Sequence, residues 1–301
     1  MKVLITGYTG YVGRNLKDFF PKDQITLVNS KNFNLQKRSN LRKIKNKFDV
    51  IYHFASWMKA GEFAKKNRGK ILKKNNLINK NFFTWWKNFQ PQAFLICLGS
   101  SCAYPNVKNL VEKKYLEGKP DLSQREFGLS KRYQFSFLKR IAKKKLNYLY
   151  LIPSTLCGEK FDYNQKYSHF IFDIIRKIIY AKKNKKKVTI WGDGFQKREI
   201  TYIGDLIFFL RNYKLLPKNE IINISSSNGH TIKWYVSIIC DYLNFDLKNV
   251  VYDSSRYVGV KNKTLNNNFL KKCIPDFIFT KDIKAIHKTI ESAKFFYNIK
   301  S

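Results

Sequence analysis

The sequence predicts an α/β protein with a doubly wound parallel sheet and a smaller C-terminal lobe. Short apolar runs rich in β-branched and aromatic residues alternate with longer helical stretches, which is typical of strand–helix–strand units. The chain of 301 residues is long enough for one large α/β domain with a small lobe. We expect the large domain to occupy residues 1–160, with part of the later chain returning to it, and the lobe to occupy mainly 161–301.

The expected elements follow from these runs and from the turn residues that bound them. Buried strands are predicted at 2–6, 25–28, 49–54, 93–98 and 147–152. Helices are predicted between them at 11–20, 38–47, 70–89 and 127–145. The second half is less regular, and there the sequence predicts helices at 168–181, 233–243 and 282–296 and strands at 188–191 and 221–224. In such a sheet, ligands bind in the crevice at the carboxyl ends of the strands.

A glycine-rich turn follows the first strand. Gly7, Gly10 and Gly13 stand three residues apart, directly between a predicted strand and a predicted helix. This context favours a tight turn, a close approach of the backbone to a pyrophosphate, and close helix packing, as in Rossmann-type dinucleotide-binding domains. The residues expected to contact the dinucleotide here also include Thr9, Tyr11 and Val12.

The end of the second predicted strand favours NADP(H) over NAD(H). An acidic residue at that place would bind the ribose hydroxyls of NAD, but the sequence there is Val28-Asn29-Ser30-Lys31. Lys31 is suited to a 2′-phosphate, and Ser30 is expected to join it in binding the cofactor. The alternative is that Lys31 is one more surface lysine in a basic chain.

Composition excludes several classes of protein. No apolar run reaches the roughly 18 residues of a membrane span, and the first residues resemble a buried strand rather than a signal peptide, so we expect a cytoplasmic protein without a membrane span. The five cysteines have no metal-binding spacing, so no metal is expected. The net charge of +37 would attract nucleic acid, but the lysines are dispersed and no basic motif with interleaved aromatic residues stands out. Nucleic acid is therefore not the expected partner.

Several segments resemble one family, the GDP-L-fucose synthases among the extended short-chain dehydrogenase/reductases. The resemblance starts at the glycine spacing and is narrowed by Gly99-Ser100-Ser101-Cys102-Ala103-Tyr104-Pro105. It continues through later motifs along almost the whole chain, namely Pro153-Ser154-Thr155-Leu156-Cys157-Gly158, Tyr167-Ser168-His169, Trp191-Gly192-Asp193-Gly194, Arg198-Glu199, Val251-Tyr252-Asp253-Ser254-Ser255 and Lys263. The family epimerises a GDP-linked 4-keto-6-deoxymannose and reduces its keto group with NADPH. The resemblance therefore implies a nucleotide-sugar epimerase or reductase of surface polysaccharide synthesis.

The resemblance also implies residue roles. Cys102 and His169 match the family's epimerisation pair, in which one group removes a proton beside a ketone and the other returns one to the opposite face. Ser100 is expected to bind a substrate oxygen, and Lys131 to bind the nicotinamide ribose. Further cofactor contacts are expected from Ala55, Pro153 and Thr155, and substrate contacts from Ser101, Lys177, Trp191, Arg198 and Lys263. The family also pairs its two long helices in a dimer, which implies a homodimer formed through residues 70–89 and 127–145.

One residue departs from the family pattern. The family has a Tyr-x-x-x-Lys pair whose tyrosine exchanges a proton with the substrate while hydride moves, but here Phe127 precedes Lys131 by four residues. Loss of a positioned acid costs ~10²–10⁴ in rate. Four explanations remain open. The residue is an introduced Tyr→Phe change, or the chain is an epimerase that has lost reduction, or it binds a cofactor without redox chemistry, or it is a reductase in which Ser100, water or Tyr133 supplies the proton.

Two classes of function therefore compete. An enzyme acting on a nucleotide-linked keto-deoxysugar explains Ser100, Cys102, His169 and Arg198 together. A non-catalytic dinucleotide-binding or RNA-binding Rossmann protein explains Phe127 and the net charge.

Overall fold

Six parallel strands form the main sheet, in the order β2-β1-β3-β4-β5-β9. The computed structural model describes residues 1–58, 62–143, 145–163, 168–256 and 259–299. The strands of this sheet are β1 (Val3–Thr6), β2 (Ile25–Val28), β3 (Val50–His53), β4 (Phe94–Leu98), β5 (Tyr148–Pro153) and β9 (Glu220–Ile224). The central strands are buried on both faces, which explains their nearly continuous apolar sequences.

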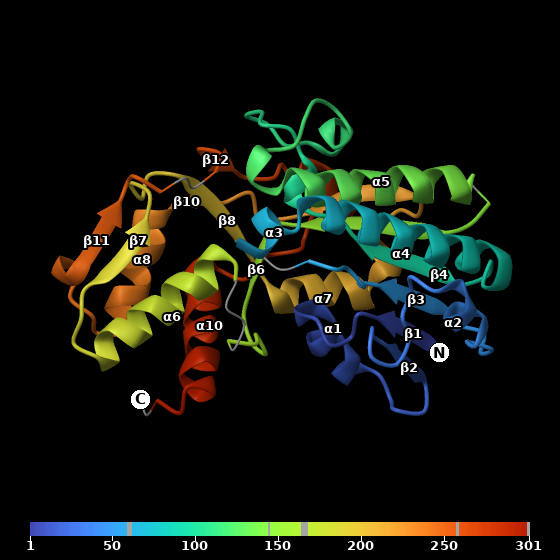
Figure 1. Cartoon of the computed structure of the whole chain (residues 1–301), viewed down its shortest axis with the longest axis horizontal. Helices are drawn as coiled ribbons and strands as arrows, with labels where there is room; N and C mark the ends of the chain where they lie inside the picture. Colours follow the sequence, from blue (N-terminus) through green and yellow to red (C-terminus); the bar gives the residue numbers. More distant parts are fainter. Residues whose placement is uncertain (59–61, 144, 164–167, 257–258, 300–301) are drawn as a thin grey trace.

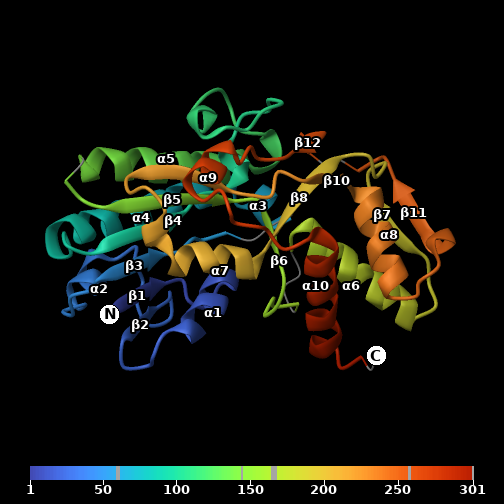
Figure 2. The ribbon, with the colours of Figure 1, turned by 180° about the vertical axis from the view of Figure 1, so that it is seen from behind.

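Helices cover both faces of this sheet (Figures 1 and 2). Two long helices, α4 and α5, pack side by side on one face, and α1 and α7 lie on the other. Alternate strand residues serve the two layers: Leu4 and Leu95 pack with α4 and α5, whereas Ile5 and Ile96 pack with α1 and α7. The helices packed around the sheet are α1 (Tyr11–Leu16), α2 (Arg38–Arg42), α3 (Glu62–Lys66), α4 (Arg68–Phe89), α5 (Arg125–Ala142), α7 (Ile203–Arg211) and α9 (Asn268–Cys273). The doubly wound α/β prediction is confirmed.

A smaller body lies at one end of the sheet (Figure 1). Its core is formed by three helices and one parallel strand pair, and a second, small sheet connects it to the main domain. The helices are α6 (Phe170–Lys183), α8 (Ile232–Tyr242) and α10 (Asp282–Phe296), and the strand pair is β7 (Val188–Trp191) with β11 (Val250–Asp253). The small sheet contains β6 (Thr155–Cys157), β8 (Lys197–Tyr202), β10 (Gly229–Thr231) and β12 (Asn262–Lys263).

Short 3₁₀ turns link several elements. They span Lys17–Phe19, Ser101–Ala103, Glu112–Lys114, Leu122–Gln124, Tyr213–Leu215 and Leu247–Asn249. Two of them, Ser101–Ala103 and Leu122–Gln124, lie beside the start of α5 and line a cavity that is described below.

The second predicted helix is shorter than expected, and tertiary contacts explain why. We predicted 38–47, but α2 ends at Arg42. The amide of Gln90 accepts a hydrogen bond from the backbone N–H of Phe48 (3.2 Å) and donates one to the carbonyl of Asn46 (2.7 Å). These bonds hold the following segment in a non-helical conformation, which local sequence preference does not reveal.

Candidate active site

A cavity of about 1180 Å³ opens at the carboxyl ends of the main-sheet strands and extends to the smaller body. It brings together most of the residues that the sequence pointed to. Those lining it are Gly7, Thr9, Gly10, Tyr11, Val12, Gly13, Ser30, Lys31, Ala55, Ser100, Ser101, Cys102, Phe127, Lys131, Pro153, Thr155, His169, Arg198 and Lys263. Lys177 and Trp191 do not line it, and Tyr167 lies outside the described residues.

The glycine loop forms one end of the cavity. Gly7 has a positive φ of 72°, and its carbonyl accepts a hydrogen bond from the N–H of Gly10 (2.9 Å). A Cβ on Gly13 would lie 2.5 Å from the Cα of Tyr8, so only glycine lets α1 start this close to the turn. The loop thus has the tight turn and open backbone that a pyrophosphate requires, and the cavity beside it is large enough for a dinucleotide.

The turn after β2 forms the far end of the cofactor region. The side chain of Asn29 accepts hydrogen bonds from the N–H groups of Lys31 (2.7 Å) and Asn32 (3.2 Å), which fixes the turn. Ser30 and Lys31 therefore face the cavity with no acidic side chain between Val28 and Lys31.

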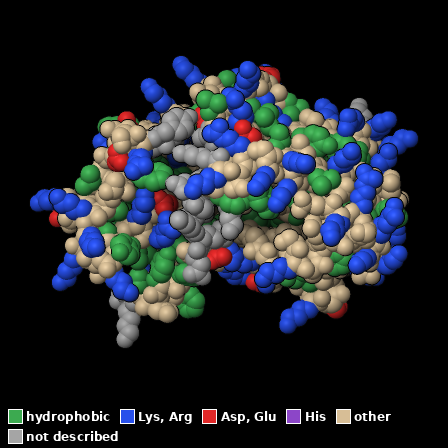
Figure 3. Space-filling model, in the orientation of Figure 1, with side chains coloured by type: hydrophobic (Ala, Val, Ile, Leu, Met, Phe, Trp, Pro, Cys, Tyr) green, Lys and Arg blue, Asp and Glu red, His purple; other side chains and the backbone are tan. Residues whose placement is uncertain are grey.

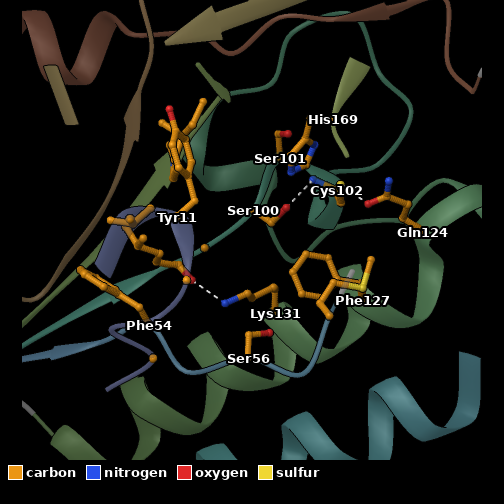
Figure 4. Close-up of a pocket in the computed structure, with 18 of the residues that line it drawn as sticks. Tyr11, Phe54, Ser56, Ser100, Ser101, Cys102, Gln124, Phe127, Lys131 and His169 are labelled. Carbon is orange, nitrogen blue, oxygen red and sulfur yellow. Dashed lines mark hydrogen bonds between the residues drawn. The ribbon is translucent and has the colours of Figure 1, made fainter. Parts of the chain in front are cut away.

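Lys131 lies in the middle of the cavity wall, on α5 (Figure 4). Its ammonium donates hydrogen bonds to the carbonyl of Leu98 (2.7 Å) and to Oε1 of Gln134 (3.1 Å). Burial lowers the pKa of Lys131 to about 8, since desolvation disfavours the charged form. Phe127 lies one turn away on the same helix, with its ring centre 5.7 Å from Nζ of Lys131. The ring lines the cavity but offers no hydroxyl.

A series of buried polar side chains connects Lys131 by hydrogen bonds to the end of β1. Gln134 donates a hydrogen bond to Asn79 (3.0 Å), which is also bonded to His53 (3.2 Å), and His53 is bonded to the hydroxyl of Thr6 (2.8 Å). Complete burial lowers the pKa of His53 to about 3, so its imidazole is neutral. The series connects the glycine loop to Lys131, and sequence patterns gave no indication of it because its members are far apart along the chain.

Cys102 lies on a 3₁₀ turn that follows β4. The hydroxyl of Ser100 accepts a hydrogen bond from the N–H of Cys102 (3.2 Å), and the thiol donates one to Oε1 of Gln124 (2.9 Å). The ammonium of Lys263 donates a hydrogen bond to the sulfur from the other side (3.2 Å). Gln124 was not predicted, and Lys263 was predicted only as a substrate contact.

His169 lies at the N-terminus of α6 and also lines this end of the cavity (Figure 4). His169 is exposed toward the cavity. Desolvation, together with the positive charge of Lys263, lowers the pKa of His169 to about 4. The imidazole is therefore neutral near pH 7 in the unliganded protein.

Arg198 enters the cavity from the small sheet. Its guanidinium donates to the carbonyls of Val260 (2.8 Å) and Lys197 (2.7 Å), and its strand pairs directly with Lys263. Two positive side chains thus stand together where the smaller body meets the main domain.

Lys177 and Trp191 form a separate cluster on the smaller body. The Lys177 ammonium lies 4.9 Å from the Trp191 ring and 3.0 Å from a carboxylate oxygen of Asp173. The guanidinium of Arg256 lies 5.7 Å from the same ring, and 48% of Trp191 is exposed. An exposed aromatic face beside two cations suits a base and its phosphates, although it lies outside the main cavity.

Known proteins resemble this chain along nearly its whole length. The model of the NAD dependent epimerase/dehydratase family matches residues 3–225. A GDP-L-colitose synthase of Yersinia pseudotuberculosis is 29% identical over 289 residues, covering 90% of this chain and 91% of the relative. A GDP-L-fucose synthase of Dictyostelium discoideum is 26% identical over 305 residues, covering 96% and 94%.

Solved structures share the fold. A GDP-L-fucose synthetase of Naegleria fowleri bound to NADP superposes with a TM-score of 0.85 at 24% identity, covering 99% of this chain and 94% of that one. Among the helices of the described residues, none combines the length and the apolar character that a membrane span requires.

Proposed function

Because the chain belongs to the NAD-dependent epimerase/dehydratase family, we propose that it epimerises a carbon beside the ketone of a GDP-linked keto-deoxysugar. The chain is an NAD(P)-dependent nucleotide-sugar epimerase/reductase, and the proposal concerns the step that it catalyses. The observation that supports the finer proposal is the grouping of Ser100, Cys102 and His169 at one end of a cavity whose other end is the glycine loop.

The proposed chemistry uses the acidity of a carbon-bound proton next to a ketone. Cys102 and His169 serve as the acid–base pair: one removes the proton, and the other returns a proton to the opposite face of the same carbon. Ser100 donates a hydrogen bond to the ketone oxygen, which stabilises the negative charge that develops there. A bound nicotinamide dinucleotide would supply hydride for a subsequent reduction, and the glycine loop and Lys131 are the residues that would hold it.

Hydrogen exchange tests this proposal. Incubation with GDP-4-keto-6-deoxymannose in heavy water is expected to introduce deuterium at C3 or C5 of the sugar, detected by mass spectrometry and NMR. Cys102→Ala and His169→Gln are expected to abolish the exchange while the proteins remain folded. Absence of exchange in the unmodified chain would refute the proposal.

Because Phe127 has no hydroxyl, we propose that this chain retains the epimerisation activity and has lost the reduction step. The epimerisation residues do not depend on the side chain at this position, whereas reduction requires a proton donor near the nicotinamide. Tyr133, two residues beyond Lys131, does not line the cavity, and its ring stacks on Phe137 at a centroid distance of 5.6 Å. The position of Tyr133 therefore does not support a role as the proton donor in place of the missing tyrosine at 127.

We propose NADP(H) as the preferred cofactor. Lys31 and Ser30 support this preference because they line the cavity at the end of β2, where an acidic residue would favour NAD. The structural relative bound to NADP is consistent with it. The expected result is a lower Kd for NADPH than for NADH, with the difference reduced in Lys31→Glu and kept in Lys22→Glu, a surface control.

For the nucleotide half of the substrate, we propose two groups of contacts. In this proposal Arg198 binds the diphosphate, and Trp191 with Lys177 binds the base. The relatives named for GDP-linked sugars support guanine as that base. Competition by GDP, CDP and dTDP against a fluorescent GDP analogue tests the choice.

We also propose a homodimer through α4 and α5. Both helices expose apolar residues on their outer faces, Leu77 on one and Leu129 on the other, beside Lys73 and Lys80. Since like charges meet across a twofold axis, the dimer is expected to strengthen as salt rises to a few tenths molar, as light scattering would detect.

The rival function, a non-catalytic or RNA-binding Rossmann protein, is less well supported. The presence of Ser100, Cys102 and His169 in one cavity supports the enzyme, since a pure binding module needs no thiol, imidazole and hydroxyl there. Tight, salt-dependent RNA binding without cofactor affinity would favour the rival over the enzyme. As an enzyme of nucleotide-sugar metabolism, the protein is proposed to act in the cytoplasm and to supply surface polysaccharide synthesis.

A further inference from the structure

We infer that Gln124 and Lys263 are positioning residues that hold the sulfur of Cys102 ready for proton transfer: Gln124 orients the thiol proton, and Lys263 stabilises the thiolate. The inference rests on the proposed function for the use made of this thiolate. The contacts themselves do not depend on it.

Two side chains contact the sulfur of Cys102, and a third fixes its backbone. The Gln124 amide oxygen accepts the thiol hydrogen bond at 2.9 Å, and the Lys263 ammonium approaches the sulfur to 3.2 Å. The backbone N–H of Cys102 is itself fixed by the Ser100 hydroxyl at 3.2 Å. Figure 4 shows Gln124 and Cys102 turned toward each other at the cavity wall.

These partners come from three separate parts of the fold. Cys102 follows β4, Gln124 ends the 3₁₀ turn before α5, and Lys263 belongs to β12 of the small sheet. Lys263 is 161 residues away from Cys102 along the chain, so the contact exists only when the small sheet is docked on the main domain. Assembly of the two bodies therefore completes the surroundings of the thiol.

The electrostatic consequence follows from charge and distance. The Lys263 ammonium, 3.2 Å from the sulfur, attracts the negative charge that develops there during proton transfer. The same ammonium disfavours a second positive charge, and it contributes to the low pKa of His169. Tyr115 also interacts electrostatically with this thiol, and it is neutral because burial raises its pKa. Lys263 thus keeps His169 neutral and able to accept a proton, and its positive charge stands beside the sulfur that becomes negative when Cys102 gives up its own proton.

The proton transfer balances without another reactant. When Cys102 acts as the base, its thiolate takes the proton from the carbon beside the ketone, the electron pair of the C–H bond moves toward the ketone oxygen, and a protonated His169 returns a proton to the opposite face of that carbon. When Cys102 acts as the acid, the neutral imidazole of His169 takes the proton from the carbon and the S–H proton goes to its opposite face, so that the sulfur keeps the electron pair and becomes the thiolate. In both directions Lys263 stabilises the charged form of the sulfur, and Gln124 accepts the hydrogen bond of the protonated form.

Alkylation by iodoacetamide tests the inference without substrate. The rate of modification of Cys102, followed by mass spectrometry of its peptide at pH 7.5, reports the reactive thiolate. We expect Lys263→Met to slow it about fivefold or more, Lys263→Arg to restore it, and Lys261→Met, an exposed neighbour, to leave it unchanged. At pH 10 the difference between Lys263→Met and the unmodified chain should largely disappear, since the thiol ionises in both.

The role of Gln124 has its own measurement. Gln124→Leu removes the acceptor of the thiol hydrogen bond while leaving Lys263 in place, so alkylation should change by no more than about twofold. Deuterium exchange into the keto-sugar should instead lose turnover with little change in KM, because the thiol is no longer aimed at the substrate.

The outcomes separate the inference from the proposed function. Equal alkylation rates in the unmodified chain and a folded Lys263→Met variant at pH 7.5 would overturn the role of Lys263, whatever the exchange experiment shows. Unchanged turnover in Gln124→Leu would overturn the role of Gln124. A slowed Lys263→Met with no deuterium exchange in any form would support the inference and reject the epimerase. Retained NADPH binding in each variant establishes that it has folded.

Discussion

In the proposed function, Phe127 stands where the reductive half of the chemistry needs a proton donor. Its ring lines the cavity within 5.7 Å of the Lys131 ammonium. Phe127→Tyr places a hydroxyl there, beside a cation that favours its ionised form. We expect NADPH oxidation by a keto-sugar to rise by ~10²–10⁴, the usual contribution of a positioned acid. Following NADPH absorbance measures it.

The matched control for this change lies on the same helix. Phe137 stacks on Tyr133 away from the cavity, so Phe137→Tyr adds the same hydroxyl without a partner at the site. It should leave NADPH oxidation unchanged. A Phe127→Tyr variant that still exchanges deuterium but oxidises no more NADPH than the unmodified chain would contradict the assignment of the missing donor to this position.

The pKa of Lys131 predicts a pH dependence of cofactor binding. Its value of about 8 means that the ammonium is charged below that pH and neutral above it. A charged donor forms stronger hydrogen bonds to ribose hydroxyls, so the affinity for NADPH should fall about fivefold as pH rises through 8. Calorimetric titrations between pH 6.5 and 9.5 measure this, and Lys131→Met should show no such step.

The low pKa of Lys131 also affects stability: the affinity for NADPH should fall as the pH rises, whereas the free energy of unfolding should rise. The pKa of Lys131 in the folded protein lies below its ordinary value of 10.5, so the unfolded chain binds more protons between these two values. The free energy of unfolding of the unmodified chain, compared with that of Lys131→Met, should therefore rise with pH across this window. A relative fall there would mean that Lys131 is not desolvated.

At the scale of elements, α5 controls where Cys102 stands. Gly128 lies in the first turns of the helix, and a Cβ there would be 2.4 Å from the carbonyl oxygen of Cys102. We expect Gly128→Ala to push the Ser101–Ala103 turn away and to lower the free energy of unfolding by about 1–3 kcal/mol, despite the better helix propensity of alanine. Deuterium exchange should fall with it. Urea unfolding and the exchange assay together measure both effects.

Gly69 provides the control within another helix. A Cβ at Gly69, in α4, would have no neighbouring atom within 4 Å. Gly69→Ala should therefore leave exchange unchanged and stabilise the protein by up to about 1 kcal/mol. If both substitutions had the same effect, packing against Cys102 would not be the reason for glycine at 128.

Local sequence patterns predicted the helices and strands better than the tertiary contacts that they make. The strands at 25–28 and 188–191 and the helix at 282–296 have the predicted bounds, because their apolar spacing and flanking turns are local properties. The segment Ile203–Arg211 was not predicted, since a short apolar run does not distinguish a buried helix from a strand. Where the helix we expected at 38–47 ends at Arg42, the deciding contact comes from Gln90.

The site shows the same division. Sequence motifs predicted that Ser100, Cys102, Lys131 and His169 belong to the site, because each lies in a recognisable local segment, and all four line the cavity. The polar residues that support them, Gln124 and Gln134 among them, have no local pattern. Each acts through a partner that only the folded chain brings near, as Lys263 does across 161 residues.

At the scale of the whole molecule, the charge has little visible organisation. Lys and Arg side chains are scattered over the face seen in Figure 3, with no single basic patch. The net charge of +37 predicts an attraction to polyanions that weakens as salt is added.

A buried carboxyl group, that of Glu199, lies at the junction between the two bodies. Glu199 on β8 accepts hydrogen bonds from the N–H groups of Ser227 (2.8 Å) and Leu265 (3.0 Å), and from the Ser225 hydroxyl. Ser225 and Ser227 follow β9 of the main sheet, and Leu265 lies two residues beyond Lys263. Glu199 therefore connects the main domain to the strand that carries Lys263 toward Cys102.

This arrangement predicts both a stability and a pH effect. Burial raises the pKa of Glu199 to about 7 from its ordinary 4.5, so the folded protein holds a proton that the unfolded chain releases between these values. The free energy of unfolding should fall as pH rises from 4.5 to 7. Glu199→Gln should remove that slope. It should also lower the free energy of unfolding by about 1–3 kcal/mol at pH 5, because its amide turns a donor toward a backbone N–H.

Urea unfolding at pH 5 and pH 8 measures these effects, with the exposed Glu220→Gln as a control that should change neither. Alkylation of Cys102 at pH 7.5 measures the consequence at a distance. A loosened Leu265 should let Lys263 withdraw from the sulfur, so Glu199→Gln should slow alkylation in the same direction as Lys263→Met. A destabilised Glu199→Gln variant with unchanged alkylation would mean that the junction holds the two bodies together without setting the position of Lys263.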